Sequence, residues 1–352
     1  MMINRLALRH TGPGKASVDR CSISPPGRGE VRVKVEAVAL NPIDWKMLDR
    51  DALSKPTVLG CDFAGVVESC GEQVERIKVG DRVAGMIQGG NTIRPDDGAF
   101  AEFLIAQAHV LIRLPEFLPF EKAATLPTAL FTAGFCLYRH FSFPYPGESK
   151  VSQSEQPVVF IYGGATAIGS MQIQLAKLSG LRVISTCSES SFDFVRKCGA
   201  DAVFDYKHPS CAVYVAKAAD GSRLATVDCI SNVSSSAICA AAMKTLGGTY
   251  IACTMASPAI DNPIVKTIRI VAFTILGREF SLGAGAPVFP IVSEDVDFAA
   301  EFAIRAERLL EQDEIKPIQE TARQGELPAI VDGLLDLKSG NVSRSRLVYS
   351  LN

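Results

Sequence analysis

The chain has 352 residues, of which 47% are hydrophobic and 21% are charged, and its formal net charge is −2 at pH 7. A charge so near zero gives no electrostatic reason to expect nucleic acid or an anionic membrane as a partner. No apolar run reaches the ~18 residues that a membrane span needs, and the amino terminus lacks a signal-peptide pattern, so we expect a cytoplasmic protein.

Residues 1–115 are predicted to form a compact β-barrel-like domain, one of the two domains that a chain of this length favours. The segment 30–40, EVRVKVEAVAL, alternates at period two, as a half-buried strand does. Further short strand-like runs, separated by Gly and Pro, follow at 63–71, 81–87, 99–106 and 109–115. Short strands at this spacing fit a barrel.

The pattern changes at about residue 120. Residues 120–141 are helical in pattern with a break forced near Pro127, and the Ser- and Pro-rich segment 142–157 is typical of an exposed loop. Helices are then expected at 167–180 and 191–200, and strands at 158–162, 182–187, 202–206, 225–231, 248–254 and 268–276. Near-continuous apolar strands spaced by helices predict a parallel sheet covered on both faces.

The last part of the chain is expected to hold two helices and a strand. The helices are the amphipathic segments 298–312 and 325–340, and the strand is 345–351.

The most informative stretch runs from the strand at 158–162 through a glycine turn into a helix. Gly163, Gly164 and Gly169 allow close backbone approach, and the N–H groups at a helix start bind a pyrophosphate. The match to G-x-G-x-x-G is imperfect, because Thr166 stands where the middle glycine belongs. The strand–turn–helix order nevertheless predicts a dinucleotide site.

The end of the second strand predicts NADPH as the dinucleotide. NAD sites usually carry an Asp or Glu there, which binds the ribose 2′-hydroxyl. This strand ends in Thr186, Cys187 and Ser188, and no acid comes before Glu189. Three basic residues nearby in the sequence could add positive charge for a 2′-phosphate: Arg196, Lys197 and Lys207. The alternative is that they are ordinary solvated surface charges.

An ordered series of motifs resembles the medium-chain dehydrogenase/reductase superfamily. The motifs are NPIDWK (41–46), GCDFAGVV (60–67), VGDRVAG (79–85), GAFAE (98–102), LPTALFTAG (126–134) and YGGATAIG (162–169). The resemblance implies an α/β protein with a GroES-like β-barrel catalytic domain and a Rossmann doubly wound parallel sheet. We expect a GroES-like substrate domain at 1–126, a Rossmann NADPH-binding domain at 127–289 and a return to the barrel at 290–352.

The sequence departs from the zinc-dependent members of that superfamily. They carry G-H-E where this chain has Gly60, Cys61 and Asp62, and the segment 86–98 has none of the cysteines of their structural-zinc lobe. The ten cysteines contain no C-x-x-C pair, and the four histidines are scattered. We therefore expect no metal. Because polarising an alcohol for hydride abstraction is difficult without zinc, reduction of an activated alkene is the favoured reaction.

Within the superfamily, three features resemble the fungal trans-acting enoyl reductases that serve polyketide synthases. They are the insertion at 142–157, Thr166 in the glycine turn, and the tail at 337–351. The resemblance implies NADPH-dependent reduction of an α,β-unsaturated thioester in secondary-metabolite biosynthesis. The partner would be the acyl carrier domain of a separate polyketide synthase or synthase–peptide synthetase hybrid, met by basic residues such as Lys46, Lys55 and Arg94.

Two other functions remain open from the sequence. One is a zinc-free quinone or enone oxidoreductase with the same fold and cofactor, and the other is a non-catalytic NADPH-binding protein. In each case we expect a monomer or a weak homodimer.

The resemblance also implies the site residues. Lys46 is the candidate catalytic cation, against the alternative of a surface lysine, whereas Asn41 and Asp44 fit a role in fixing the loop. The cofactor-binding candidates are Pro42, Ile43, Asp44, Trp45, Lys46, Gly163, Gly164, Ala165, Thr166, Ala167, Gly169, Ser188, Glu189, Ser190, Ser191, Tyr206, Leu246, Gly247, Val342 and Ser343. The substrate-binding candidates, expected along a cleft between the domains and at the carboxyl end of a strand, are Thr128, Ala129, Leu130, Phe131, Thr132, Ala133, Gly134, Phe135, Phe273, Thr274, Ile275, Leu276 and Gly277.

Overall fold

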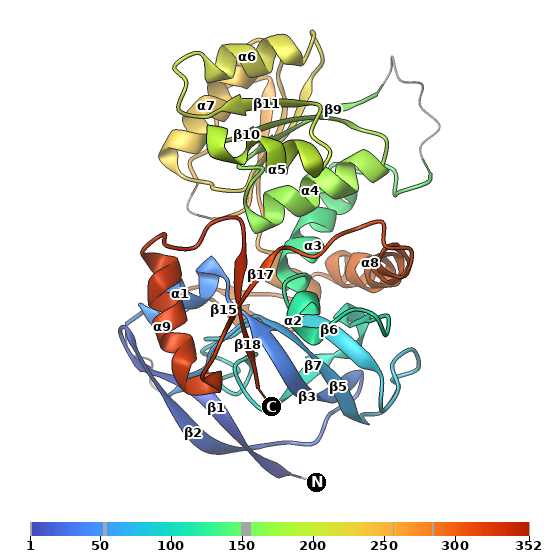
Figure 1. Ribbon diagram of the computed structural model, residues 1–352, viewed down its shortest axis with the longest axis vertical. Helices are drawn as coiled ribbons and strands as arrows, with labels where there is room; N and C mark the ends of the chain where they lie inside the picture. The colour runs from blue at the N-terminus through green and yellow to red at the C-terminus, as the bar shows by residue number, and fades with distance from the viewer. Residues whose placement is uncertain (1, 52–54, 149–155, 256, 284, 352) are drawn as a thin grey trace. The chain divides into compact units, whose positions relative to one another are not determined.

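The computed structural model describes residues 2–51, 55–148, 156–255, 257–283 and 285–351. The chain forms two compact units, one made of Met1–Thr128 with Phe273–Asn352 and the other of Ala129–Ala272 (Figure 1). Across the described ranges, no helix has both the length and the apolar character needed to cross a bilayer.

The first unit is built on antiparallel sheets. Its main sheet has the order β17-β18-β3-β5-β6-β8, with β7 also paired to β3, and a smaller sheet has the order β2-β1-β4. The strands are β1 (Ile3–Gly12), β2 (Lys15–Ile23), β3 (Glu30–Ala39), β4 (Thr57–Val58), β5 (Asp62–Cys70), β6 (Arg82–Met86), β7 (Phe103–Gln107), β8 (Ile112–Arg113), β15 (Phe280–Ser281), β16 (Val288–Phe289), β17 (Glu320–Arg323) and β18 (Arg346–Ser350). Its helical segments are α1 (Pro42–Leu48), η1 (Ala108–Val110), α2 (Phe120–Ala123), α8 (Ser293–Glu311) and α9 (Glu326–Lys338). Only β17 runs parallel to its neighbour, β18, among these described pairings.

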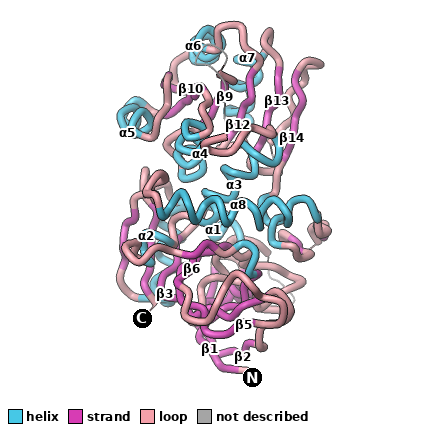
Figure 2. The backbone as a smooth tube through the Cα atoms, turned by 90° about the vertical axis from the view of Figure 1, so that its right-hand side faces the viewer, coloured by secondary structure: helices cyan, strands magenta, loops and turns pink. Residues whose placement is uncertain are grey.

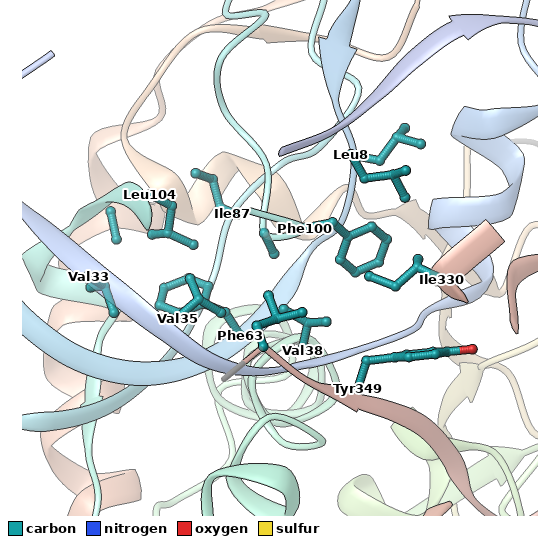
Figure 3. Close-up of a cluster of buried hydrophobic side chains, with 14 of the residues drawn as sticks. Leu8, Val33, Val35, Val38, Phe63, Ile87, Phe100, Leu104, Ile330 and Tyr349 are labelled. Atoms are coloured by element: carbon teal, nitrogen blue, oxygen red, sulfur yellow. The ribbon is translucent and has the colours of Figure 1, made fainter. Parts of the chain in front are cut away.

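Apolar side chains from distant parts of the chain form the core of this unit. Figure 3 shows Val33, Val35 and Val38 of β3 together with Phe63 of β5 and Phe100. The carboxyl-terminal elements α9 and β18 contribute further side chains to the same cluster. The return of the chain after residue 290 therefore completes the barrel core.

The second unit is a parallel sheet with helices around it (Figure 2). Its order, β11-β10-β9-β12-β13-β14, is the 3-2-1-4-5-6 order of a Rossmann fold. The strands are β9 (Val158–Tyr162), β10 (Arg182–Cys187), β11 (Ala202–Asp205), β12 (Leu224–Asp228), β13 (Gly248–Ala252) and β14 (Val265–Arg269). The helical segments are α4 (Ala167–Leu178), η4 (Glu189–Ser191), α5 (Phe192–Lys197), α6 (Cys211–Ala218) and α7 (Val233–Met243). The predicted fold class is confirmed.

The helical region after residue 120 breaks where the sequence predicts. The short helix α2 ends before Pro127, which begins the next helix, α3 (Pro127–Gly134). A π-helical segment, η2 (Phe135–His140), continues from it. Proline suits the first turn of a helix because the N–H that it lacks would have no intrahelical partner there. Of the predicted loop at 142–157, residues 149–155 lie outside the described part.

The strand expected at 268–276 is wrong for most of its length. The last strand of the parallel sheet, β14, ends at Arg269, and a 3₁₀ helix, η5 (Ala272–Leu276), follows. His109 Nε2 lies 2.9 Å from the carbonyl oxygen of Ile275, and Gln88 donates to the carbonyl of Ser281 at 2.9 Å. These bonds hold the segment in the first unit, so the second unit ends at Ala272, whereas the sequence analysis placed the domain boundary at 289.

Candidate cofactor and active site

The glycine turn has the close packing that a pyrophosphate cradle needs. Gly163 has a φ of 85°, a conformation that favours glycine. A Cβ atom on Gly169 would lie 2.2 Å from the carbonyl oxygen of Gly163, and one on Gly164 would lie 2.1 Å from Ser185 Oγ. Larger residues are therefore excluded from both positions, and the N–H groups at the start of α4 stay open to a ligand.

Thr166 takes the place of the middle glycine without closing this turn. Its hydroxyl donates to the Gly163 carbonyl at 2.8 Å and accepts from the Gly169 N–H at 3.0 Å. Thr166 is thus the N-cap of α4, which explains why the imperfect motif still builds the strand–turn–helix unit.

Hydroxyl groups gather where β10 ends. Ser188 Oγ lies 3.2 Å from Ser190 Oγ and 3.3 Å from Ser191 Oγ, while the Glu189 side chain is exposed. Tyr206 follows β11 at the same edge, and its ring centroid lies 6.2 Å from that of Tyr162. The edge therefore presents hydroxyls and an aromatic ring beside the glycine turn.

The basic residues near this edge have interactions of their own. Arg196 lies 3.6 Å from Asp193 and over the ring of Phe192. Lys207 lies 5.9 Å from the ring centroid of Tyr206. Lys207 therefore contacts the cofactor candidate Tyr206, its neighbour in the sequence.

Two cofactor candidates are not brought to this edge. Leu246 and Gly247 precede β13, and a Cβ atom on Gly247 would lie 2.7 Å from the Ile264 carbonyl, just before β14. Because all the strands are parallel, these residues lie at the amino edge of the sheet, opposite the glycine turn. They therefore lie outside the candidate cofactor site.

Asp228, at the carboxyl end of β12, is a residue that the sequence analysis missed. Its buried carboxylate accepts from Ser235 Oγ at 2.6 Å, from Tyr250 OH at 2.9 Å and from the backbone N–H of Ser231 at 2.7 Å. It fixes the loop beside the glycine turn, because a Cβ atom on Gly163 would lie 3.2 Å from the Ile230 side chain. The available signal was an acid at the end of a buried strand, followed by several serines.

In the first unit, a buried ion pair joins three separate segments. Asp62 Oδ2 lies 2.7 Å from Arg346 and accepts from Asn41 Nδ2 at 3.1 Å. Asp62 Oδ1 accepts from the backbone N–H of Thr128 at 2.9 Å and from its hydroxyl at 2.6 Å. Arg346 also donates to the backbone carbonyl of Thr125 at 2.7 Å. The pair ties the start of α1, the start of α3 and β18 together.

This donor set does not fit zinc. Both oxygens of Asp62 already accept hydrogen bonds, and the adjacent guanidinium would repel a divalent cation. Among the described residues, no cluster of three or more His, Cys, Asp or Glu side chains is arranged to hold a metal ion.

Asp44 and Cys61 are buried next to this pair. Burial raises the pKa of Asp44 to about 7, although the hydrogen bond from the Asn41 N–H and the neighbouring Cys61 thiol oppose the shift. Asp44 Oδ2 accepts from that N–H at 2.7 Å and closes the first turn of α1. Burial also raises the pKa of the Cys61 thiol well above its ordinary value, so that the thiol is protonated at neutral pH.

Lys46 lies on the exposed side of α1. Its ammonium is 5.7 Å from the ring centroid of Trp45, and Lys338, at the end of α9, is 5.9 Å from the same ring. Lys338 Nζ also lies 2.7 Å from Asp49 Oδ2. The candidates Val342 and Ser343 lie between Lys338, which contacts α1, and Arg346, which contacts Asp62. The structure thus brings the residues on both sides of Val342 and Ser343 to α1 and to Asp62.

The substrate candidates fall into two groups. Thr128 is bound to Asp62, and the side chains from Ala129 to Phe135 are buried on α3 and at the start of η2. Phe273, Ile275 and Leu276 are buried in the 3₁₀ helix η5 of the first unit, and the Phe273 ring lies edge-on to Phe280 with 6.0 Å between centroids. The prediction that residues 273–277 lie at the carboxyl end of a strand of the parallel sheet is wrong, because the last strand of that sheet ends at Arg269.

Comparisons with known proteins cover both units. The alcohol dehydrogenase GroES-like domain matches residues 27–116. The chain is 38% identical to the trans-enoyl reductase ACTTS2 of Alternaria alternata over 100% of both chains. It is 36% identical to the trans-enoyl reductase resD of Aspergillus sclerotiorum, over 97% of this chain and 99% of that one. The solved structure of mycobacterial Rv1454c complexed with NADPH shares the fold, with a TM-score of 0.71, 23% identity and coverage of 98% of this chain and 99% of that one.

Proposed function

The chain belongs to the trans-enoyl reductase family, and from this premise we propose that it reduces the α,β-double bond of an acyl thioester with NADPH. The observation that carries the proposal is the full-length similarity to trans-enoyl reductases. A buried Asp62–Arg346 ion pair, at the place where zinc-dependent members of the superfamily need metal ligands, agrees with it. The superfamily resemblance that the sequence indicates is confirmed by these relatives.

The cofactor lies against the glycine turn in this proposal. Bound NADPH supplies a hydride for the β-carbon of the substrate. The backbone N–H groups of Ala165 and Ala167, at the start of α4, would hold its pyrophosphate, and Gly163 and Gly164 would let it approach the backbone closely. The hydroxyl groups of Ser188 and its neighbours can donate hydrogen bonds to a 2′-phosphate, whereas a carboxylate at this place would repel it. The shared fold with an NADPH complex supports this placement.

Lys46 is the residue proposed to act on the substrate. Negative charge develops on the thioester oxygen as the double bond is reduced, and an ammonium aimed at that oxygen lowers the barrier. The capped first turn of α1 and the Asp62–Arg346 pair hold the backbone that carries Lys46. Solvent supplies the proton to the α-carbon in this scheme.

The substrate is proposed to arrive on the acyl carrier domain of a separate polyketide synthase. The name trans-enoyl reductase, shared by the full-length relatives, supports an acyl chain delivered by another protein. Carrier domains are acidic, and exposed basic side chains such as Lys55 would favour the encounter through charge complementarity.

The test compares four acceptors with the purified chain and NADPH. They are a simple quinone, a free enone, a small enoyl thioester and the same acyl group on its carrier protein. The proposal expects the highest kcat/KM for the carrier-bound thioester. A quinone reduced with much higher kcat/KM than any thioester would establish a quinone reductase instead. Tight NADPH binding without turnover of any acceptor would establish a non-catalytic binding protein.

Charge reversal at Lys55 separates delivery from chemistry. Lys55→Glu should raise KM for the carrier-bound substrate severalfold and leave kcat/KM for the small thioester unchanged. Lys217→Glu, on α6 of the other unit, is the matched control. An equal effect of both variants on both substrates would remove Lys55 from the docking surface.

A further inference from the structure

Cysteines end two neighbouring strands of the parallel sheet beside the glycine turn. The parallel register of β12 and β13 places the residues that follow them, Cys229 and Cys253, next to each other. The N–H of Cys253 donates to the Asp228 carbonyl at 3.2 Å, and the N–H of Cys229 donates to the Tyr162 carbonyl at 3.1 Å. The sheet pairing therefore continues to both cysteines at the carboxyl edge.

The two thiols are within reach of a disulfide. Neighbouring strands lie about 4.8 Å apart, and a disulfide joins Cα atoms roughly 4.4–6.8 Å apart. Side chains at registered positions project to the same face, and the Cys253 thiol is close enough to that of Cys229 to raise its pKa. A third cysteine, Cys136 of η2, lies near Cys253 and raises the pKa of its thiol. Cys229 and Cys253 are partly exposed as residues, but their thiols are buried, so an oxidant that reaches them has to be small.

Cys229 also touches the proposed cofactor cradle. A Cβ atom on Gly163 would lie 3.6 Å from the Cβ atom of Cys229. The Cys229 thiol also interacts with Thr166, whose hydroxyl caps α4 and donates to the Gly163 carbonyl. A displacement of the Cys229 sulfur toward Cys253 would therefore remove one of the contacts of the turn that binds the pyrophosphate.

We propose that Cys229 and Cys253 form an oxidisable dithiol that controls dinucleotide binding at the glycine turn. The inference rests on the proposed cofactor site and is independent of the substrate. In the reaction, one protein thiolate attacks a small disulfide and releases one small thiol, leaving a mixed disulfide. The second protein thiol loses its proton to solvent, attacks the first protein sulfur and releases the second small thiol. Two protein thiols are oxidised, and one small disulfide is reduced to two thiols.

The surroundings of the pair favour the protonated form of both thiols. The neighbouring Cys253 thiol and burial raise the pKa of Cys229 well above its ordinary value, and Asp228 is the nearby charged group that adds to this shift. The neighbouring Cys136 thiol, burial and Asp228 likewise raise the pKa of Cys253. Because the thiolate is the reactive form, oxidation is slow at neutral pH and faster at alkaline pH.

The experiment measures the Kd of NADPH on the full chain before and after oxidation by dithiodipyridine. Peptide mass spectrometry should find a Cys229–Cys253 disulfide, with NADPH binding weakened at least about fivefold and restored by dithiothreitol. Saturating NADPH should oppose disulfide formation to the same extent, because coupling between two equilibria is reciprocal.

Serine variants assign the effect to the pair. Cys253→Ser, which leaves the contact of Cys229 with the turn in place, should bind NADPH as the wild-type chain does and lose the sensitivity to oxidation, and Cys229→Ser should lose that sensitivity whatever its starting Kd. Cys187→Ser should keep it, since Cys187 ends β10 at the same edge but has Asp205 as its registered neighbour. Failure to form the 229–253 disulfide, or an unchanged Kd in the oxidised protein, overturns the proposal. If the reduced chain does not bind NADPH at all, the proposed cofactor site fails, and this inference fails with it.

Discussion

Two lysines approach the ring of Trp45, and they differ in what else they contact. Lys338 is held by Asp49 at 2.7 Å, whereas Lys46 projects from the exposed side of α1. The anchored lysine has its charge neutralised locally. Lys46 is therefore the better candidate for a cation that acts on substrate.

Replacing Lys46 tests this assignment. Lys46→Ala should lower kcat by roughly 100-fold, the usual loss when one donor to a developing oxyanion is removed. The Kd of NADPH should change far less, and Lys46→Arg should recover part of the activity. Lys338→Ala is the matched control and should keep kcat. A defect confined to the Kd of NADPH would make Lys46 a cofactor-positioning residue, and unchanged kinetics would return it to the protein surface.

Asp44 should leave a pH signature in stability. Its pKa rises from 3.8 in the unfolded chain to about 7 in the fold, chiefly through burial. Below 3.8 both states hold the proton. Between 3.8 and about 7 the folded state binds more protons than the unfolded state, so this contribution to stability is lost as pH rises.

Asp44→Asn should remove this loss of stability with rising pH. The free energy of unfolding of the variant, relative to wild type, should rise by up to about 4 kcal/mol between pH 3.8 and 7. Urea denaturation across this range measures the difference. Asp193→Asn, whose wild-type side chain is 92% exposed, is the control and should show no such trend. Parallel curves for wild type and Asp44→Asn would show that the buried carboxyl titrates normally.

At the scale of elements, one strand end decides the proposed choice of nucleotide. The main chain of β10 supports the glycine turn, since the N–H groups of Gly163 and Gly164 donate to the Thr186 carbonyl at 3.1 and 2.9 Å. The residues that follow carry hydroxyls. A carboxylate there would bind the ribose 2′-hydroxyl of NADH and repel the phosphate of NADPH.

Ser188→Asp should therefore reverse the preference. The ratio of the NADPH and NADH affinities should shift by at least about tenfold toward NADH, because close like charges cost several kcal/mol. Titration with both cofactors measures the ratio. Ser222→Asp adds the same charge before β12, at the opposite edge of the sheet, and should not change it. Tighter NADH than NADPH binding by the wild-type chain would contradict the cofactor assignment.

At the scale of the whole molecule, the proposed function predicts an active site that works without metal. The purified chain should hold far less than one zinc per molecule by elemental analysis, and its activity should survive a strong chelator. The physical reason is that Arg346 supplies the positive charge beside Asp62. A zinc-dependent alcohol dehydrogenase treated in parallel is the control. One tightly bound zinc per chain, with activity lost in chelator, would refute the prediction.

Local pattern was sufficient for much of this molecule. The period-two segment at 30–40 became β3, the break at Pro127 separated α2 from α3, and the strand–turn–helix signal became β9 and α4. These features depend on near neighbours in the chain, whose hydrophobic spacing and backbone preferences act over a few residues. The motif series likewise indicated the family, which the full-length relatives confirm.

Only the tertiary structure decided the contacts between distant segments. Nothing near Asp62 in the sequence points to Arg346, because an ion pair is selected by the folded environment that buries both charges. The register of β12 and β13 brought Cys229 to Cys253, and it placed Gly247 at the edge away from the glycine turn. The apolar run after Arg269 could have extended a strand, but hydrogen bonds from the first unit hold it as a 3₁₀ helix. The hydrophobicity of this segment predicts that it is buried. Its conformation depends on packing partners that lie far along the chain.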